Sequence, residues 1–430
     1  MSNPVKKFVP CIYLYKKHAV KSLNDITVVE ADPIRLVQLY NENDADELIV
    51  FDMSEGDEEH EANLDILKEI CAVAEMDVTG AGNVKRMEDV KKILYTGCKR
   101  AILDYEKESN IAITEEVSLK FGKDKIWVSY SDPAVLSSNK ELLEKYVSSL
   151  VLMNPHQLRE TMDVTDLPFI VQIDQIALNR LIEVFQYDRV SGVTGNTIND
   201  NIHEILALKE LCLEHDIAIE KLTAAYSWEQ FKKNSDGMVP VVVQDYRTQE
   251  VLMVAYMNEE AYRETLRTGK MTYYSRSRQE LWLKGATSGH YQYVKSLTAD
   301  CDLDTILAKV SQVGAACHTG AKSCFFNEIA RKDYEQADNP LQVFEDVFRV
   351  IKDRKVHPKE GSYTNYLFDK GIDKILKKLG EEATEIVIAA KNPNANEVKY
   401  EISDFLYHMM VLMAEKDVNW EEITTELANR

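Results

Sequence analysis

The sequence has no run of about twenty apolar residues, the length that an apolar helix needs to cross a membrane. Its first residues, Met-Ser-Asn-Pro-Val-Lys-Lys, lack the apolar core of a signal peptide. Basic residues are fewer than acidic ones, 51 against 72, and the formal net charge is −21. This balance argues against a general basic surface for nucleic acid or anionic membranes, although local basic pockets for a phosphorylated small molecule are compatible with it. We therefore expect no nucleic-acid partner and no membrane association.

Cysteine is also scarce, with seven residues in a chain of 430. An odd number of widely spread cysteines fits a reducing compartment, where clustered thiols bind metal more often than they form disulfides. The cytoplasm is the expected location. The length exceeds that of one typical core and predicts about two to four domains.

Residues 1–225 alternate short apolar runs with amphipathic, helix-like segments, which predicts an N-terminal (β/α)8 TIM-barrel-like domain. Two helices are expected, over residues 34–42 with Asp32 as N-cap and Pro33 at the first helical position, and over residues 63–74. The eight expected strands cover residues 8–14, 47–52, 77–79, 100–103, 125–130, 149–153, 168–173 and 189–193.

This stretch resembles the histidine-biosynthetic barrels, above all the cyclase subunit of imidazole glycerol phosphate synthase. The resemblance lies in Val-Pro-Cys-Ile at 9–12, Ala-Asp-Pro at 31–33, Asp-Glu-Leu-Ile-Val-Phe-Asp at 46–52 and the Gly80, Gly82 turn. The two positions at which that family carries its catalytic aspartates hold Tyr13 and Tyr130 here.

A phenol cannot replace a carboxylate general base near neutral pH. We therefore interpret the barrel as degenerate, serving as a scaffold, oligomerisation or regulatory domain. The alternative is a barrel with a changed activity, for which Asp52, Gly80 and Gly82 are the first candidate residues.

A central, mainly β (α+β) domain is predicted over residues 226–335. The junction between it and the barrel is expected within residues 222–234. Strands are expected at 239–244 and 250–257 as a hairpin, and at 271–275. Between them, Asn258 is expected to cap a helix that reaches about Arg267 and ends at Gly269.

Three cysteines fall within two dozen residues of this domain. They lie in Asp-Cys-Asp-Leu-Asp at 300–304, Ala-Cys-His-Thr-Gly at 316–320 and Ser-Cys-Phe-Phe at 323–326. Thiolates are the soft ligands that Zn²⁺ prefers, so Cys301, Cys317 and Cys324 are candidate zinc ligands. Three cysteines leave a tetrahedral zinc ion one open position for a catalytic water, whose pKa the ion lowers. The alternative is a set of scattered structural cysteines.

The first of these motifs also carries three carboxylates, Asp300, Asp302 and Asp304, which suit the harder Mg²⁺. If residues 300–304 form a strand, alternation places the aspartates on one face and Cys301 on the other. The thiolate and the carboxylates would then serve different sites.

Cations, hydroxyls and glycines are concentrated just upstream, in the segment from Ser275 to His290. Arg276, Arg278 and Lys284, together with Ser288 and backbone amides near the glycines, indicate a loop that binds phosphate. The alternative is a solvated turn with ordinary surface cations.

The motifs at 275–285, 287–290, 300–304, 316–320 and 323–325 together resemble phosphoribosyl-AMP cyclohydrolase. In that family the cysteines bind zinc across a dimer interface and the aspartates bind magnesium. The resemblance implies hydrolytic opening of the adenine ring between N1 and C6. His290 and His318 are the candidate proton-transfer residues, because imidazole exchanges protons near pH 7; a structural role is the alternative for each.

Residues 340–430, which follow Asp338-Asn-Pro, predict an all-α domain with helices at 341–353, 372–390 and 396–414. Glu382 and Glu385 lie one turn apart beside the apolar stripe of the second helix, and Glu401 and Asp404 lie on the corresponding flank of the third. If these helices pack as an antiparallel hairpin, the four carboxylates converge and suit Mg²⁺. The alternative is acidic residues solvated on helix faces.

Lys-Lys-Leu-Gly-Glu-Glu-Ala-Thr-Glu at 377–385 and Glu-Ile-Ser-Asp-Phe-Leu-Tyr-His at 401–408 resemble phosphoribosyl-ATP pyrophosphohydrolase, a relative of the all-α nucleotide pyrophosphatases. In that family such carboxylates hold Mg²⁺ beside the triphosphate. The sequence leaves open whether Glu381 is a further ligand, and which of Lys374, Lys377 and Lys378 contacts phosphate.

The resemblances imply a bifunctional hydrolase of histidine biosynthesis that acts on phosphoribosyl-ATP and then phosphoribosyl-AMP, uses Zn²⁺ and Mg²⁺, and forms a homodimer or higher homo-oligomer. Two alternatives stay open at this point. One is a nonenzymatic scaffold or regulatory protein with structural metal sites, and the other is a cyclohydrolase fused to a general nucleotide pyrophosphatase.

Overall fold

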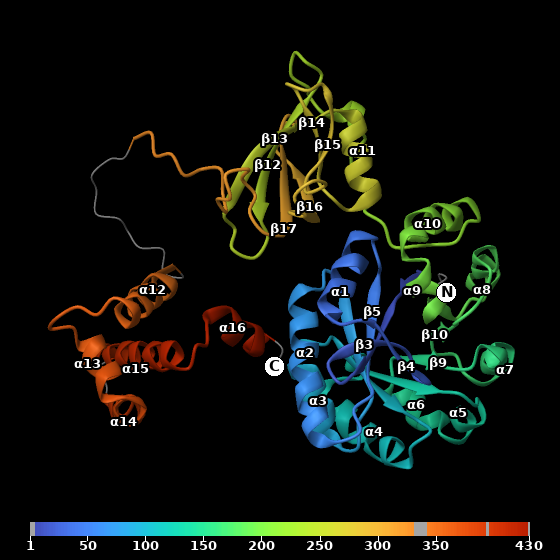
Figure 1. Cartoon of the computed structure of the whole chain (residues 1–430), viewed down its shortest axis with the longest axis horizontal. Coiled ribbons are helices and arrows are strands. Elements are labelled where there is room, and N and C mark those ends of the chain that lie inside the picture. The colour runs from blue at the N-terminus through green and yellow to red at the C-terminus, as the bar shows by residue number, and fades with distance from the viewer. Residues whose placement is uncertain (1–4, 331–341, 393–394, 429–430) are drawn as a thin grey trace. The chain divides into compact units, whose positions relative to one another are not determined.

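The computed structural model describes residues 5–330, 342–392 and 395–428 (Figure 1). The chain divides into two compact units, Met1–Ile329 and Ala330–Arg430. The first unit contains a parallel β/α barrel and a separate β-rich domain, and the second is helical. The multidomain fold class expected from the sequence is therefore confirmed. Among the described helices, none combines the length and apolarity needed to cross a membrane.

The barrel has parallel strands inside and helices outside (Figure 1). All eight strands expected from the sequence are present, the first of them as two shorter strands, β1 and β2. The strands are β1 (Lys7–Val9), β2 (Cys11–Tyr15), β5 (Glu47–Asp52), β6 (Asp77–Ala81), β7 (Arg100–Asp104), β8 (Ile126–Tyr130), β9 (Ser149–Leu152), β10 (Phe169–Gln172) and β11 (Val190–Thr194). The helices are α1 (Pro33–Glu42), α2 (Asp57–Val73), α3 (Met87–Tyr95), α4 (Glu108–Phe121), α5 (Ala134–Ser138), α6 (Lys140–Tyr146), α7 (Leu158–Val164), α8 (Leu181–Phe185), α9 (Asn196–Asp200) and α10 (Ile205–Glu214).

The barrel closes at Pro10, which divides the expected first strand into β1 and β2. Proline has no N–H to donate to a neighbouring strand. The chain before Pro10 pairs with β11, in register Lys7↔Gly192, and the chain after it pairs with β5, in register Cys11↔Ile49. Each remaining barrel strand pairs with the next in sequence, so the eight form a closed ring.

An antiparallel hairpin of β3 (His18–Ser22) and β4 (Asp25–Glu30) extends from β2 before α1. These two strands are not among those expected from the sequence. The cap of α1 does follow expectation, because the Asp32 side chain accepts a hydrogen bond from the Ile34 N–H and Pro33 occupies the first turn.

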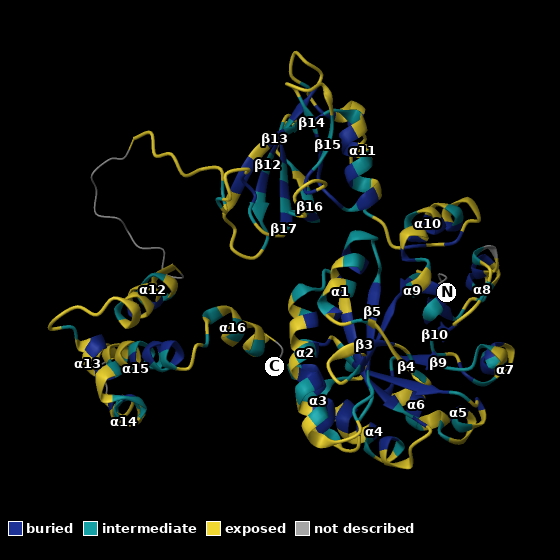
Figure 2. Cartoon of the chain, in the orientation of Figure 1, coloured by how far each residue is buried: buried dark blue, intermediate teal, exposed yellow. Residues whose placement is uncertain are grey.

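Side-chain alternation along the barrel strands produces two apolar layers. One cluster fills the barrel and includes Cys11, Tyr13, Phe51, Trp127 and Ile170. The other, much larger, lies between strands and helices. Figure 2 shows the barrel strands as mostly buried.

The β-rich domain holds a sheet in the order β13-β12-β17-β16 and a separate hairpin of β14 and β15. Asn258 caps the single long helix through the Ala261 N–H, and Gly269 ends it at φ +67°, as expected. Trp228 and Phe231, which lie in the expected junction, belong to this domain's core. The elements are β12 (Val239–Asp245), β13 (Val251–Met257), α11 (Glu259–Thr268), β14 (Thr272–Ser275), β15 (Glu280–Leu283), β16 (Gln292–Ala299) and β17 (Ile306–Gln312).

The helical unit consists of α12 (Gln342–Val356), α13 (Tyr363–Lys370), α14 (Ile372–Ala389), α15 (Ala395–Glu415) and α16 (Trp420–Ala428). The three helices expected here are present, and α14 packs along α15. A small core includes Phe348, Ile351, Leu367, Ile375 and Val411. The expected boundary at Asp338-Asn-Pro and the Pro393 helix break lie outside the described residues.

Gly82 follows β6 at φ +92°, and a Cβ there would lie 2.1 Å from the Asp52 carbonyl oxygen. We expect Gly82→Ala to lower the free energy of unfolding of the barrel by about 2 kcal/mol or more, because a left-handed backbone and a backbone clash combine. Chemical denaturation of the full chain would measure this. Gly56→Ala is the control, since nothing lies within 4 Å of its added methyl group. An equal effect of both substitutions would contradict the prediction.

Candidate active sites

The antiparallel pair β16 and β17 sets the geometry of the β-rich domain. Gln292 pairs with Gln312 at one end, and Ala299 pairs with Ile306 at the other. At about 3.3 Å per residue, the seven residues of β17 separate these ends by roughly 20 Å. We call the end that leads into residues 300–304 the aspartate end, and the end that leads to Cys317 the cysteine end.

At the aspartate end, residues 300–304 form a turn, so the side-chain alternation that a strand would impose there does not apply. The Asp300 Oδ1 atom accepts hydrogen bonds from the backbone N–H groups of Asp304, at 3.0 Å, and Thr305, at 3.2 Å. Leu303 adopts φ +60°, which breaks strand geometry.

The turn nevertheless gathers the three aspartates, because oxygen atoms of Asp300, Asp302 and Asp304 all lie within 4.8 Å of one another. Desolvation opposes ionisation of Asp300, but the N–H groups of Thr305 and Asp304 outweigh it and lower the pKa of that carboxyl. Three exposed carboxyl groups at this spacing fit a hydrated Mg²⁺ ion.

Arg276 lies at the same end of the sheet. Its guanidinium stacks 3.9 Å from the centroid of the Tyr256 ring. Tyr256 of β13 pairs with Pro240 of β12, and the next residue of β12, Val241, pairs with Ile306 of β17, so Tyr256 lies at the aspartate end. Arg276 and Tyr256 line a hollow of about 530 Å³. Arg278 follows in the same turn, 3.3 Å from the Glu280 carboxylate.

At the cysteine end, the side chains of Cys317 and Cys324 are in contact. The Cys324 N–H donates to the Leu252 carbonyl at 2.7 Å, which holds the segment after β17 against β13. The Thr319 hydroxyl donates to the Cys317 sulfur at 3.1 Å. That bond and the Thr319 backbone N–H lower the pKa of Cys317, whereas burial raises the pKa of Cys324. Two adjacent thiols, one of them with a lowered pKa, fit a soft metal ion.

Lys284 is buried beside these thiols, and its ammonium donates to the His290 carbonyl at 3.2 Å. Burial lowers the pKa of Lys284, while the charges of Cys324 and Cys317 oppose that shift. His290 packs against Gly314, where an added Cβ would lie 2.6 Å from the imidazole ring. His318 is exposed, with its Nδ1 atom 4.0 Å from the Cys317 sulfur. The exposed Ser288 hydroxyl accepts a hydrogen bond from the His290 N–H at 3.2 Å.

The structure therefore divides the expected residues of this domain between two places. Cys301 lies at the aspartate end and does not join Cys317 and Cys324 within one chain. Arg276 and Arg278 likewise lie far from Lys284, which follows the opposite end of the β14–β15 hairpin. The single phosphate-binding loop expected from the sequence is thus not assembled within one chain.

In the helical unit, α14 and α15 bring their carboxylates together. Oxygen atoms of Glu382, Glu401 and Asp404 lie within 4.8 Å of one another, and Glu385 contacts Glu401. Desolvation, the contact with Glu385 and the charges of Glu382 and Asp404 raise the pKa of Glu401. Carboxylates gathered in this way supply several oxygen donors, which fit a divalent cation.

Glu382 is buried and lies against His408, with 3.6 Å between its Oε1 atom and the His408 Nδ1 atom. The Tyr363 hydroxyl and the His408 Nε2 atom are 3.1 Å apart. Glu381 instead faces Lys377 and Lys378, at 3.5 and 3.0 Å. The structure thus separates Glu381 from the cluster.

Thr319, Tyr363 and His408 were not singled out in the sequence. Thr319 and His408 do lie inside motifs that the sequence shows, and His408 is one helical turn from Asp404, which was a usable signal. Tyr363 comes from another helix, and no local pattern links it to Glu382.

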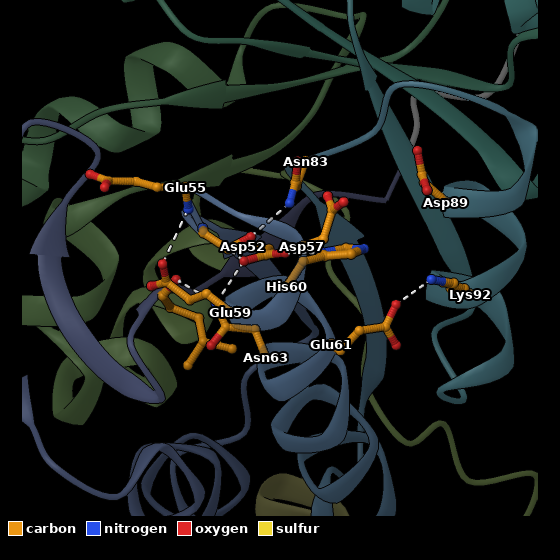
Figure 3. A network of polar contacts seen from close by, with 12 residues as sticks. Asp52, Glu55, Asp57, Glu59, His60, Glu61, Asn63, Asn83, Asp89 and Lys92 are labelled. Carbon is orange, nitrogen blue, oxygen red and sulfur yellow. Dashed lines mark hydrogen bonds and ion pairs between the residues drawn. The ribbon is translucent and has the colours of Figure 1, made fainter.

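In the barrel, Asp52 ends β5 and is held by α2 (Figure 3). Its Oδ2 atom lies 2.5 Å from the His60 Nδ1 atom, and its Oδ1 atom accepts a hydrogen bond from the Asn63 amide at 2.7 Å. The Cβ that Gly80 lacks would lie 2.5 Å from the Ile93 side chain. Asp52, Gly80 and Gly82 are thus all engaged in the packing of the barrel.

The expected replacements Tyr13 and Tyr130 are buried in the barrel. The Tyr13 ring stacks on Phe51, with 5.3 Å between centroids. The Tyr130 hydroxyl donates to Thr161 at 3.1 Å. Burial raises the pKa of both phenols, so neither can act as a base near neutral pH.

Comparisons with known families match each part of the chain. The profile described as Phosphoribosyl-AMP cyclohydrolase matches residues 253–326, and the one described as Phosphoribosyl-ATP pyrophosphohydrolase matches residues 344–430. A third, described as Histidine biosynthesis protein, matches residues 7–141. The fold and these matches define the chain as a multidomain hydrolase with cyclohydrolase and pyrophosphohydrolase domains.

Curated relatives make the assignment more specific. The chain is 50% identical over 210 residues to the histidine biosynthesis bifunctional protein HisIE of Thermoanaerobacter pseudethanolicus, covering 46% of this chain and 97% of the relative. It is 46% identical over 202 residues to the protein of that name from Bacillus subtilis, covering 47% of this chain and 95% of the relative. The chain therefore belongs to the HisIE family of bifunctional histidine-biosynthesis proteins.

The raised pKa of Glu401 predicts a pH dependence of the metal-free helical unit. The folded state holds this proton more tightly than the unfolded state, whose ordinary pKa is 4.5. Stability should therefore fall as the pH rises from below 4.5 through the higher pKa of the folded state. Glu401→Gln should remove this fall and raise the unfolding temperature near neutral pH.

Calorimetry of the full chain in the presence of a chelator would measure both effects. The exposed Glu360 provides the control, because Glu360→Gln should leave the pH dependence unchanged. A Glu401→Gln variant with the wild-type pH dependence would be inconsistent with carboxylate repulsion in this cluster.

Proposed function

We propose that this chain hydrolyses phosphoribosyl-ATP to phosphoribosyl-AMP and pyrophosphate in residues 340–430, and opens the adenine ring of phosphoribosyl-AMP in residues 226–335. Its match to the pyrophosphohydrolase and cyclohydrolase families of histidine biosynthesis supports both steps. Residues 1–225 would form a barrel without hydrolytic activity.

We further propose that each ring-opening site combines two copies of the chain. The observation that carries this proposal is the separation of about 20 Å between the ends of β17. Cys317 and Cys324 of one copy would meet Cys301 of the other, and together they would hold Zn²⁺. A zinc ion with three thiolates supplies a Lewis acid that lowers the pKa of a water molecule in its fourth position.

The same pairing would unite the remaining residues of the site. Lys284, His290 and His318 at the cysteine end of one copy would face Arg276, Arg278 and the three aspartates of the other. The arginines, Lys284 and the Ser288 hydroxyl would bind the phosphates, and the aspartates would hold Mg²⁺. His290 and His318 would exchange protons with the attacking water and the ring nitrogen.

An uncovered apolar face on the helical unit supports self-association. Leu376 and Val387 belong to the apolar stripe of α14 but are 48% and 63% exposed, and Ile402 of α15 is 41% exposed. A second copy would bury such a face, which fits the expected homodimer or higher homo-oligomer.

For the first reaction, we propose that Glu382, Glu385, Glu401 and Asp404 hold Mg²⁺. One or two Mg²⁺ ions would offset the carboxylate repulsion that helps to raise the pKa of Glu401. The same ions would neutralise negative charge on the triphosphate of the substrate. Lys378, which lies 3.5 Å from Glu382, is the lysine best placed to contact phosphate. His408 and Tyr363 would orient Glu382.

The family assignment disfavours both alternatives, the nonenzymatic scaffold and the general nucleotide pyrophosphatase. Comparing hydrolysis of phosphoribosyl-ATP with that of ordinary nucleoside triphosphates would test the second directly. Equal rates for both would support a general pyrophosphatase.

Shared sites predict complementation between inactive chains. Cys301→Ala and Cys317→Ala should each lose zinc and ring-opening activity. In a co-expressed mixture, half of the dimers contain both variants, and each of those has one intact site out of two. About a quarter of wild-type activity should therefore return.

Zinc content and phosphoribosyl-AMP turnover would be measured on each variant and on the mixture. A mixture that stays inactive would show that the three cysteines do not come from two copies. Full activity in Cys317→Ala after loss of zinc would exclude the zinc assignment altogether.

Two neighbouring glutamates on α14, Glu381 and Glu382, allow a matched comparison of variants in the pyrophosphohydrolase site. Glu382→Gln should reduce phosphoribosyl-ATP hydrolysis by about a hundredfold or more, because it removes a buried ligand from the cluster. Glu381→Gln should have a much smaller effect, because Glu381 faces lysines. Both variants should open phosphoribosyl-AMP at the wild-type rate. Equal losses in the two variants would refute this choice of ligands.

A further inference from the structure

Glu75 of the barrel contacts both strands of the β16–β17 hairpin. It lies in the turn between α2 and β6. Its Oε1 atom accepts a hydrogen bond from the Ser311 hydroxyl of β17 at 2.6 Å, and its Oε2 atom lies 2.6 Å from the Lys295 ammonium of β16. The Glu75 side chain is 18% exposed and that of Lys295 is 29% exposed. A partly desolvated carboxylate with two partners is held more firmly than an ordinary surface ion pair.

Two further contacts flank this one. The Lys270 ammonium donates to the carbonyl of Glu42, the last residue of α1, which has no basic residue in its last turn. A buried lysine of the cyclohydrolase domain thus supplies the positive charge that favours a helix C-terminus. Arg267 of α11 pairs with Glu210 of α10 at 3.2 Å. A cavity of about 530 Å³ lies among these contacts. The barrel and the cyclohydrolase domain are therefore joined around it by polar side-chain contacts rather than by continuous apolar packing.

Ser311 stands directly before the segment that leads to the cysteine end. The next residue, Gln312, accepts a hydrogen bond from the Gln292 amide at 2.7 Å, and the Val313 N–H donates to the Tyr291 carbonyl at 3.0 Å. Gly314 then packs on the His290 ring, and Cys317 follows. His290 lies just before β16 and Cys317 lies just after β17. A group that fixes Lys295 of β16 and Ser311 of β17 therefore fixes the strand ends from which these two residues extend.

We propose that Glu75 is a positioning residue, through which the barrel holds the cysteine end of the cyclohydrolase sheet in its reactive arrangement. The proposal rests on the proposed ring-opening function, and gives the barrel a role that needs no active site of its own. Glu75 touches no reacting group; it acts through Ser311 and Lys295. Displacement of reacting groups by about 1 Å is enough to slow an enzyme severely, so a loosened hairpin root should reduce turnover.

Charge reversal in the full chain tests this arrangement. Glu75→Lys places two ammonium groups together, and the double variant Glu75→Lys with Lys295→Glu restores an ion pair of opposite polarity. Glu69→Lys is the matched control, because Glu69 is an exposed glutamate on α2. Hydrogen exchange at the amides of residues 306–313 reports the hairpin directly, and phosphoribosyl-ATP hydrolysis by the same molecules reports the intactness of the helical unit.

Glu75→Lys should speed exchange in residues 306–313 and lower kcat for ring opening by about fivefold or more, with KM changed by less than about twofold. The double variant should recover most of both, and Glu69→Lys should behave as wild type. Phosphoribosyl-ATP hydrolysis should stay unchanged throughout.

The proposal is overturned if Glu75→Lys leaves exchange or kcat unchanged, if the double variant fails to recover them, or if Glu69→Lys causes the same loss. A wild-type chain that does not open phosphoribosyl-AMP would instead refute the proposed function. The exchange of residues 306–313, and its recovery in the double variant, would then decide whether Glu75 holds the hairpin.

Discussion

The length of a pair of hydrogen-bonded strands is the constraint on which the cyclohydrolase domain depends. Paired strands are close to rigid along their axis, so the register of β16 with β17 keeps Cys301 and Cys317 at opposite ends of the sheet. Thiolates must lie within about 2.3 Å of a zinc ion to bind it, and no rotamer change spans such a separation. In the proposed function, the chain would display two complementary halves of a site, and a symmetric partner would bring unlike halves together.

The barrel uses its buried tyrosines for packing and its glutamates for contacts with another domain. The Tyr13 ring lies in the cluster that fills the barrel, whereas the Tyr130 ring lies in the cluster between strands and helices, where its hydroxyl reaches Thr161. Contacts with the cyclohydrolase domain come from Glu42, Glu75 and Glu210. Glu42 ends α1 and Glu75 follows α2, both just before a barrel strand begins, and Glu210 lies within α10. The face at which barrels usually perform chemistry takes no part in these contacts.

The periodic spacing of apolar residues, together with helix-capping residues, made most helices and strands predictable from the sequence. All eight barrel strands, the Asn258 and Gly269 limits of α11, and the α14–α15 pair follow from local patterns. The β3–β4 hairpin did not, because its exposed apolar residues, such as Ile26 and Val28, blur the alternation that marks a half-buried strand. Residues 300–304 alternate like a strand but form a turn, because Asp300 satisfies the amides that a neighbouring strand would use.

The candidate sites were predictable only in part, for a related reason. Helical spacing was enough to bring Glu382, Glu401 and Asp404 together, since both helices are continuous and adjacent in sequence. Spacing could not tell that Arg276 and Lys284 lie apart, because that depends on the hairpin between them. Nor could it reveal Glu75, whose partners are more than two hundred residues away.

The network around Asp52 has a consequence for how this barrel can change further. The Asp52 carboxylate anchors α2 through His60 and Asn63, while the neighbouring backbone leaves Gly82 no room for a side chain. Freeing it for catalysis would remove supports from a helix, a strand and a turn at once. A single substitution that released Asp52 would therefore lower the stability of the barrel before it could change any activity, so selection for a folded barrel keeps Asp52 in its present contacts.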